Sequence, residues 1–169
     1  FSKADALIKI PVESENGIGL ALSSFVNWRE DVHFEILETE IVVYSAEYMY
    51  AGTLDAIGMI RGKLSLADYK SSNGIWTEYY YQVASYRRAL EEMNKKKLEQ
   101  EWIIRFGKED GAFEARELTD ALGTYQDRLE GFLYALALSN KHDLLESLEK
   151  ARVAMVRQSS KLSGMLTNT

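Results

Sequence analysis

Tyr50-Ala-Gly-Thr-Leu-Asp55 and Leu66-Ala-Asp-Tyr-Lys-Ser-Ser72 are the two stretches that decide how this chain folds. Each is a largely apolar run that ends on, or passes through, an acidic residue. Successive side chains of a β-strand point to opposite faces, so Asp68 and Lys70 point the same way. If the two runs are neighbouring antiparallel strands, Asp55 meets that pair at one place. Two carboxylates and an ammonium group there suit a hard divalent cation and a water or phosphate beside it.

A third motif follows on a segment whose apolar residues recur at helical spacing. Gln82 and Tyr86 are four residues apart and are therefore neighbours on one helix face. Asp55, then Asp68-x-Lys70, then Gln82-x-x-x-Tyr86 resembles the PD-(D/E)XK nuclease superfamily. The resemblance is greatest to its RecB-like exonuclease branch, which includes CRISPR-associated, phage and mitochondrial genome-maintenance exonucleases. It covers residues 36–138.

This resemblance implies a fold and an activity. The implied fold is α/β, with a restriction-endonuclease-like core in which helices flank a central mixed β-sheet; the residue pattern alone predicts only α/β or α+β. A single nuclease domain over residues 1–169 is expected, with its core at 34–138. The implied activity is metal-dependent hydrolysis of DNA phosphodiester bonds by an exonuclease that acts on DNA ends in recombination, repair or replication. The products would carry 5′-phosphate and 3′-hydroxyl ends.

The resemblance also implies a role for each site residue. Asp55 and Asp68 are expected to bind Mg²⁺ or Mn²⁺, with the backbone carbonyl of Tyr69 as a further oxygen ligand. Glu40, on the preceding strand, is either a ligand of a second metal ion or a solvated acid, and both interpretations stay open. Lys70 is expected to orient the attacking water and stabilise the charge that develops on the phosphate. The expected catalytic set is Asp55, Asp68, Lys70 and Gln82, in which Gln82 orients the lysine or the water.

Four residues are expected to contact DNA, namely Tyr86, Arg87, Ser71 and Ser72. Plainer structural interpretations exist for the whole site. An acid at a strand end can simply face solvent, a strand lysine can simply be exposed, and Gln82 with Tyr86 can be an ordinary polar and aromatic helix face. The combination of all three motifs in this order favours the nuclease interpretation, because an isolated Asp-x-Lys carries almost no information.

Composition limits the chemistry that is available. The chain has 169 residues, which is enough for one domain with a real core. It contains no cysteine and 2 histidines, which excludes disulfides and thiolate metal sites and disfavours a histidine-rich zinc site. A bound metal is therefore expected to be held by oxygen, which favours magnesium or manganese. No apolar run of about 18 residues is present, so no membrane partner is expected.

The formal net charge of −6 has the wrong sign for a protein that binds nucleic acid over its whole surface. The distribution of charge weakens this objection. Five basic residues lie at 87–97 against two acids, and residues 150–169 contain four basic residues and no acid. A locally basic groove together with a bound metal ion can still hold DNA.

The sequence predicts the following elements. Helices are expected at 17–28, at 76–97, from Leu118 to Leu136 and at 143–159, and His142 is expected in a loop before the last of them. Strands are expected at 34–45, 51–60, 64–70 and 102–106, with a hairpin connection at Arg61-Gly62-Lys63 and turns or loops at 71–74 and 107–111. Gly52 and Gly58 are expected where the backbone bulges or is closely approached.

Two further functional interpretations remain beside the nuclease. One is a catalytically inactive nuclease-fold module that binds DNA or supports an assembly. The other is a structural α/β protein without a DNA role, which the acidic charge favours. DNA is the expected partner, alone or with a helicase, recombinase or single-strand-binding protein. The expected location is the cytoplasm of a bacterial or phage-infected cell, or an organelle matrix, and not the exterior. Because the chain begins with Phe1 rather than methionine, residues are expected to be missing before it.

Overall fold

The computed structural model describes residues 17–94, 97–107, 111–120 and 123–166. The packing divides the chain into two compact units, Phe1–Leu129 and Glu130–Thr169, and the expected single nuclease domain stays a prediction. We describe each unit by itself. Within the described residues, no helix is both long and apolar enough to span a membrane.

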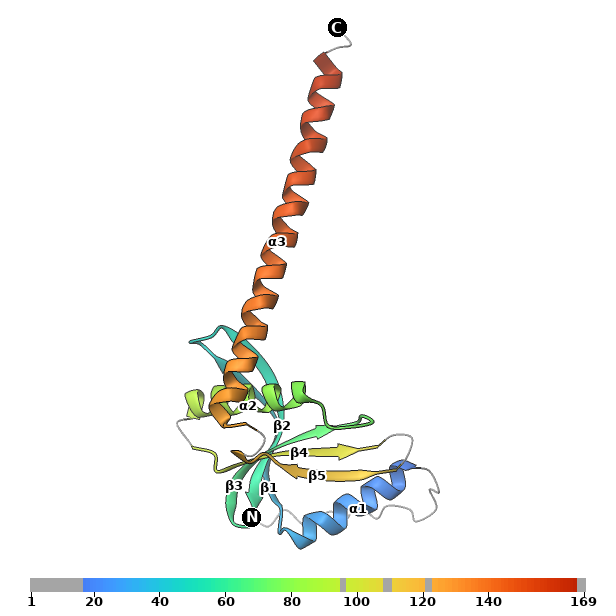
Figure 1. Ribbon diagram of the computed structural model, residues 1–169, viewed down its shortest axis with the longest axis vertical. Coiled ribbons are helices and arrows are strands. Elements are labelled where there is room, and N and C mark those ends of the chain that lie inside the picture. The colour runs from blue at the N-terminus through green and yellow to red at the C-terminus, as the bar shows by residue number, and fades with distance from the viewer. Residues whose placement is uncertain (1–16, 95–96, 108–110, 121–122, 167–169) are drawn as a thin grey trace. The chain divides into compact units, whose positions relative to one another are not determined.

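The first unit is built on a five-stranded sheet in the order β1-β2-β3-β4-β5 (Figure 1). Neighbouring strands are antiparallel except β3 and β4, which are parallel and are joined through helix α2. This confirms the expected α/β class, with a central mixed sheet flanked by helices. The elements are α1 (Gly17–Asp31), β1 (Glu35–Ser45), β2 (Tyr50–Ile60), β3 (Lys63–Lys70), α2 (Thr77–Asn94), β4 (Gln100–Phe106) and β5 (Phe113–Glu117).

A two-residue hairpin fixes the register of the two strands that carry the acids. Arg61 and Gly62 both have positive φ, 52° and 75°. Positive φ at both central residues is the geometry of a type I′ turn, whose twist matches that of the flanking strands. The predicted hairpin is therefore confirmed. It pairs Ile60 with Lys63 and, further along, Ala56 with Ala67, so the next residues outward are Asp55 and Asp68.

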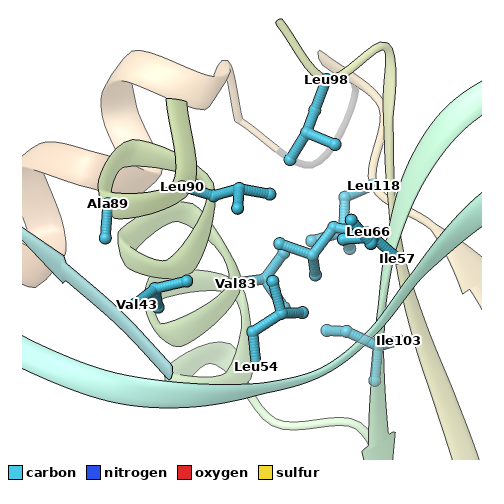
Figure 2. Close-up of a cluster of buried hydrophobic side chains, with 10 residues drawn as sticks. All are labelled: Val43, Leu54, Ile57, Leu66, Val83, Ala89, Leu90, Leu98, Ile103 and Leu118. Atoms are coloured by element: carbon cyan, nitrogen blue, oxygen red, sulfur yellow. The ribbon is translucent and has the colours of Figure 1, made fainter. Parts of the chain in front are cut away.

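The two faces of the sheet bury different cores. Helix α2 covers one face, where apolar side chains of the helix and of the strands interlock (Figure 2). The opposite face packs against α1 and is rich in aromatic rings, with Phe25 and Trp28 of the helix against Trp102, Phe106 and Phe113 of the strands. The cluster under α2 consists of Val43, Leu54, Ile57, Leu66, Val83, Ala89, Leu90, Leu98, Ile103 and Leu118.

Helix α2 and strand β4 differ from their predicted bounds, and strand β5 was not predicted. Helix α2 ends at Asn94 rather than at 97, because the chain turns back to bury Leu98, whose backbone N–H donates to Glu91 Oε1 at 3.0 Å. Strand β4 begins at Gln100, two residues earlier than predicted. Strand β5 was not predicted at all, since charged residues alternate with the others in Phe113–Glu117 and the apolar signal is weak.

The helix predicted from Leu118 is also wrong. Leu118 is buried at the edge of the core, and its N–H donates to the carbonyl of Glu101 at 2.8 Å. Helix α3 starts instead at Tyr125 and continues to Leu166. Thr124 caps it: its Oγ1 accepts from the N–H of Asp127 at 3.2 Å, while Asp127 Oδ2 accepts from the N–H of Thr124 at 2.8 Å. This reciprocal pairing satisfies two backbone N–H groups and fixes the start of the helix.

The second unit consists of the remainder of α3 as one continuous helix. Two separate helices were predicted here, with His142 in a loop between them, and that prediction is wrong. Asn140, Lys141 and His142 are helical, and His142 Nε2 lies 3.3 Å from Glu146 Oε1 one turn on. Helix propensity is a weak signal over a short polar run, so the sequence does not show that the helix continues through these residues.

Candidate active site

Asp55 lies just beyond the last backbone pair between β2 and β3. Backbone pairing extends from the hairpin to Ala56 and Ala67. Beyond it, Asp55 Oδ2 accepts a hydrogen bond from the backbone N–H of Tyr69 at 2.7 Å. The carboxylate thus accepts the hydrogen bond that a backbone carbonyl would accept in a regular pair. This bond fixes one carboxylate oxygen and leaves the other for a further partner.

Asp68 and Lys70 lie on the α2 side of β3 and form a buried ion pair. The Asp68 residue is 1% exposed, and its Oδ2 lies 2.7 Å from Lys70 Nζ. Burial raises the pKa of Asp68 from 3.8 to about 6; the nearby ammonium of Lys70 opposes this rise and the charge of Asp55 adds to it. Extended by one residue, the strand register places Asp55 opposite Asp68, and Lys70 pairs with Asp68, so the structure brings these three residues together; their roles stay predictions.

A series of hydrogen bonds, which we call the relay, connects Lys70 to two side chains of α2. Lys70 Nζ donates to Gln82 Oε1 at 2.8 Å, and Gln82 Nε2 donates to the hydroxyl of Tyr86 at 2.7 Å. Lys70 Nζ also lies 5.0 Å from the centroid of the Tyr79 ring, which adds a cation–π contact. The ammonium group is thus held on three sides by side chains from one strand and one helix.

Tyr86 fits into a gap that only glycine leaves open. A Cβ atom at Gly52 would lie 2.8 Å from Tyr86 Cε1, closer than carbon atoms approach in folded proteins. The expected close approach at Gly52 is confirmed, and so is that at Gly58, where a Cβ would lie 2.3 Å from the carbonyl oxygen of Glu35. Burial raises the pKa of Tyr86; the hydrogen bond with Gln82 opposes this rise, and the charges of Asp68 and Asp55 add to it.

The donor set fits one hard cation. Asp68 Oδ2 is buried, and the ammonium of Lys70 lies 2.7 Å from it. Two neighbouring carboxylates suit a divalent ion, since Mg²⁺ is commonly held by one or two carboxylates, with waters and substrate phosphates filling its other positions. Asp55 and Asp68 are the residues that could hold it. Tyr69 as a carbonyl ligand stays a prediction.

Glu40 does not form a group of possible metal ligands with Asp55 and Asp68. No group of three Asp, Glu or His side chains suited to a metal ion occurs in the part of the chain that the structure describes. Glu40 is exposed on β1 and has a φ of 53°, in the left-handed region that residues other than glycine rarely adopt. Its role as a second-metal ligand therefore stays a prediction.

The four residues expected to contact DNA lie in different surroundings. Ser71 and Ser72 follow β3 directly, and the Ser72 carbonyl accepts from Arg105 Nη1 at 3.0 Å, which ties this loop to β4. Tyr86 belongs to the relay described above. Arg87 is mostly buried: it bonds Glu91 at 3.0 Å and the Leu98 carbonyl at 3.0 Å, an arrangement that gives no support to a DNA contact.

The basic stretch at 87–97 contributes less positive charge than its composition suggests. Arg88 pairs with Glu47 and lies over the Tyr48 ring, so both arginines of the stretch have acidic partners. Lys95 and Lys96 lie outside the described residues. Sequence reasoning also missed Tyr79 and Arg105; the spacing of Tyr79, three residues before Gln82 on the same helix face, is the signal that could have found it.

Comparisons with known proteins add little to this geometry. No protein-family model matches the chain, and no curated protein matches it. A solved structure described as LHK-Exo in complex with dAMP is similar over 77% of this chain and 71% of its own, with 12% identity and a TM-score of 0.43. One described as SSO0001 is similar over 69% and 57%, with 18% identity and a TM-score of 0.35. Likenesses this distant carry no argument about function, which has to be argued from the site itself.

Proposed function

We propose that this protein is a metal-dependent DNA nuclease and that it acts as an exonuclease on DNA ends. The observation that carries the proposal is the continuous set of contacts from the buried Asp68 carboxylate through Lys70 and Gln82 to Tyr86, with Asp55 beside it. This is the set of residues on which the sequence resembles the PD-(D/E)XK nucleases of the RecB-like branch. The raised pKa of the buried Asp68, next to a charged partner and a second carboxylate, supports the proposal, because such groups are enriched at functional sites.

Bound Mg²⁺ or Mn²⁺ would lower the pKa of a water and polarise the scissile phosphate. The residues of the chain would hold the ion and position the water and the phosphate. Asp55 and Asp68 bind the ion, and the hydrogen bond from the Tyr69 N–H fixes the orientation of the Asp55 carboxylate. Lys70 places its ammonium group next to the carboxylates, where it orients the attacking water and offsets the negative charge of the phosphate.

Gln82 and Tyr86 are positioning residues in this scheme. Gln82 accepts from Lys70 through Oε1 and donates to Tyr86 through Nε2, so the orientation of its amide is fixed at both ends. The ammonium group is thereby kept from swinging toward solvent, which it otherwise does readily on a four-carbon stem. Substitution of Lys70 by arginine would not preserve this geometry, since a planar guanidinium cannot occupy the place of a compact ammonium.

The test is degradation of end-labelled linear DNA, single- and double-stranded, with magnesium or manganese and with EDTA in parallel. A closed circular DNA is the second substrate. Metal-dependent loss of the linear DNA with survival of the circle is expected. Cleavage of the circle would contradict exonuclease action but not nuclease action. No cleavage of any substrate with either metal would contradict both.

Two observations favour an inactive nuclease-fold module instead. The described residues contain two carboxylates at the site rather than three, and the net charge of the chain is −6. On this alternative the protein binds the metal ion or DNA without turning DNA over. Titration calorimetry with Mg²⁺ and salt-dependent DNA binding would then be positive while the cleavage assay stays negative.

A further inference from the structure

An exposed tryptophan lies at the N-terminal end of α2, close to the candidate active site. Trp76 is 55% exposed, and its carbonyl accepts a hydrogen bond from the backbone N–H of Tyr79 at 3.1 Å, in the first turn of the helix. The Tyr79 ring in turn lies 5.0 Å from Lys70 Nζ. Trp76 is therefore one helical turn away from a side chain that contacts the proposed catalytic lysine.

The loop between β3 and α2 holds Trp76 in place. Arg105 Nη1 of β4 donates to the Ser72 carbonyl at 3.0 Å, and Ser72 Oγ donates to the Gly74 carbonyl at 2.8 Å. A Cβ atom at Gly74 would lie 3.5 Å from a ring carbon of Trp76, so part of the ring packs against this glycine. Ile75, between the two, packs against the core under α2. The tryptophan is thus ordered by its own loop, although more than half of it is exposed.

Trp76 differs in this respect from the other two tryptophans of the chain. Trp102 is 4% exposed, and Trp28 packs against the aromatic cluster between α1 and the sheet. Those two rings stabilise the fold by burial, whereas the larger part of Trp76 is not buried. An ordered aromatic ring with a free surface is what proteins that bind single-stranded DNA use to stack a base.

The neighbouring charges favour a base rather than a phosphate on this ring. Thr77 and Glu78 follow Trp76 directly, and both are exposed. The carboxylate of Glu78 repels a phosphate group but not an uncharged base. In the proposed function the phosphate lies at Lys70 and the metal ion. A base of the same strand is therefore the part of the substrate that Trp76 is suited to contact.

We infer that Trp76 stacks on an unpaired base of the DNA strand whose phosphate lies at Lys70. This inference rests on the proposed function and names its substrate class, which is single-stranded DNA or a frayed end. Inside a duplex each base is already stacked between its neighbours, so only an unpaired base offers its face to the ring. The contact does not read the sequence, because every base has a π-face.

The first test compares two strands that differ only in their bases. Binding of a labelled oligo(dT) and of an abasic strand of equal length is measured by fluorescence anisotropy, with Ca²⁺ in place of Mg²⁺. Trp76→Ala should weaken binding of oligo(dT) about 10-fold or more and leave binding of the abasic strand unchanged. Trp76→Phe retains a π-face and should bind oligo(dT) within a few-fold of wild type.

Tyr44→Ala is the matched control in the same assay. Tyr44 is 53% exposed, close to the value for Trp76, and lies on β1, which is not a neighbour of β3 in the sheet. Its removal should leave the binding of both strands unchanged. The inference is overturned if Trp76→Ala weakens both strands equally or neither, if no strand binds, or if wild type binds a blunt duplex more tightly than oligo(dT).

The second test uses the fluorescence of Trp76 itself. Because Trp28 and Trp102 pack within the fold, oligo(dT) should quench the emission of wild type through Trp76, and the abasic strand should not. Trp76→Phe should bind oligo(dT) without this quenching, and quenching that persists in Trp76→Phe would overturn the inference. Cleavage of DNA without any dependence of binding on Trp76 would contradict this inference alone. Binding that depends on Trp76 without cleavage would contradict only the catalytic part of the proposed function.

Discussion

The Asp55 carboxylate accepts a hydrogen bond from the backbone N–H of Tyr69 at 2.7 Å, directly beyond the last backbone pair of β2 and β3. The side chain therefore has two tasks, one in the fold and one in the proposed metal site. Asparagine retains a carbonyl oxygen that can accept this hydrogen bond, whereas alanine does not. Substitutions at this position can thus separate the two tasks.

Asp55→Asn is expected to leave the fold intact and to abolish stabilisation by metal. In wild type, added Mg²⁺ should raise the melting temperature, because an ion that binds only the folded state stabilises it. Asp55→Asn should keep the metal-free melting temperature and lose the Mg²⁺ response. Asp55→Ala should lose the response and also about 1–2 kcal/mol of unfolding free energy, since it leaves the Tyr69 N–H without its acceptor. An unchanged Mg²⁺ response in Asp55→Asn would contradict the metal assignment.

Asp68 should make the stability of the metal-free protein depend on pH. Its pKa is raised by burial from 3.8 to about 6 in the folded state, so the folded protein holds this proton more tightly than the unfolded chain. The contribution of Asp68 to stability is therefore greatest below pH 4 and is lost as the pH rises through about 6. Asp68→Asn has no carboxyl group to titrate at this position, so its stability should not show this decrease with rising pH.

The measurement is chemical denaturation of both proteins in EDTA between pH 4 and pH 7. The unfolding free energy of Asp68→Asn relative to wild type should increase by roughly 2–3 kcal/mol over this range. A difference that does not vary with pH would show that the carboxylate of Asp68 has an ordinary pKa.

Gly52→Ala should disturb the site through Tyr86. The added methyl group would lie 2.8 Å from Tyr86 Cε1, so the ring must shift, which strains the hydrogen bond between its hydroxyl and Gln82. A loss of about 1–3 kcal/mol of stability is expected from overpacking, together with a fall in cleavage rate. Gly74→Ala is the control, because its new methyl group would make only an ordinary 3.5 Å contact with Trp76.

Tyr86→Phe separates packing from hydrogen bonding at the same place. The ring still fills the gap at Gly52, but Gln82 Nε2 loses its acceptor. The stability should change by less than about 1.5 kcal/mol, while the cleavage rate should fall as Gln82 no longer holds Lys70 in position. Equal activity of Tyr86→Phe and wild type would show that the relay ends at Gln82.

Glu101 should matter for stability and not for chemistry. It is 1% exposed and pairs with the buried Arg128 at the start of α3, and its Oε1 lies 3.8 Å from Arg87 Nη1. Glu101→Gln leaves buried guanidinium charge without its counter-charge, which is expected to cost about 3 kcal/mol or more of unfolding free energy. Glu35→Gln, at an exposed position of β1, should change it by less than about 0.5 kcal/mol. A stable Glu101→Gln protein would contradict the importance assigned to this pair.

The central sheet and the site motifs could be predicted because their signals are local. The hairpin at Arg61 and Gly62, the spacing of Asp68 and Lys70 on one strand face, and the four-residue spacing of Gln82 and Tyr86 each follow from the period of one element. The burial of Asp68 and the hydrogen bond from the Tyr69 N–H to Asp55 could not be predicted, since both depend on how two strands diverge in space.

The elements after β4 show more clearly what could not be predicted from the sequence. Strand β5 has few apolar residues and exists because β4 offers it an edge, which no local pattern records. The start of α3 depends on the reciprocal hydrogen bonds of Thr124 and Asp127, and its continuation through His142 crosses a short polar run in which helix propensity is a weak signal. The partners of Arg87 could not be predicted either, because the turn after α2 brings the Leu98 carbonyl to it, and its DNA contact stays a prediction.

The central claim is that Lys70 serves chemistry rather than folding, and one paired comparison tests it most directly. Lys70→Ala and Lys63→Ala remove a lysine from opposite ends of the same strand, and Lys63 is exposed. The rate of degradation of linear DNA should fall by about 100-fold or more in Lys70→Ala, as removal of a charge-stabilising donor does in other enzymes, and stay near wild type in Lys63→Ala. Equal rates in the two folded variants would contradict the catalytic assignment.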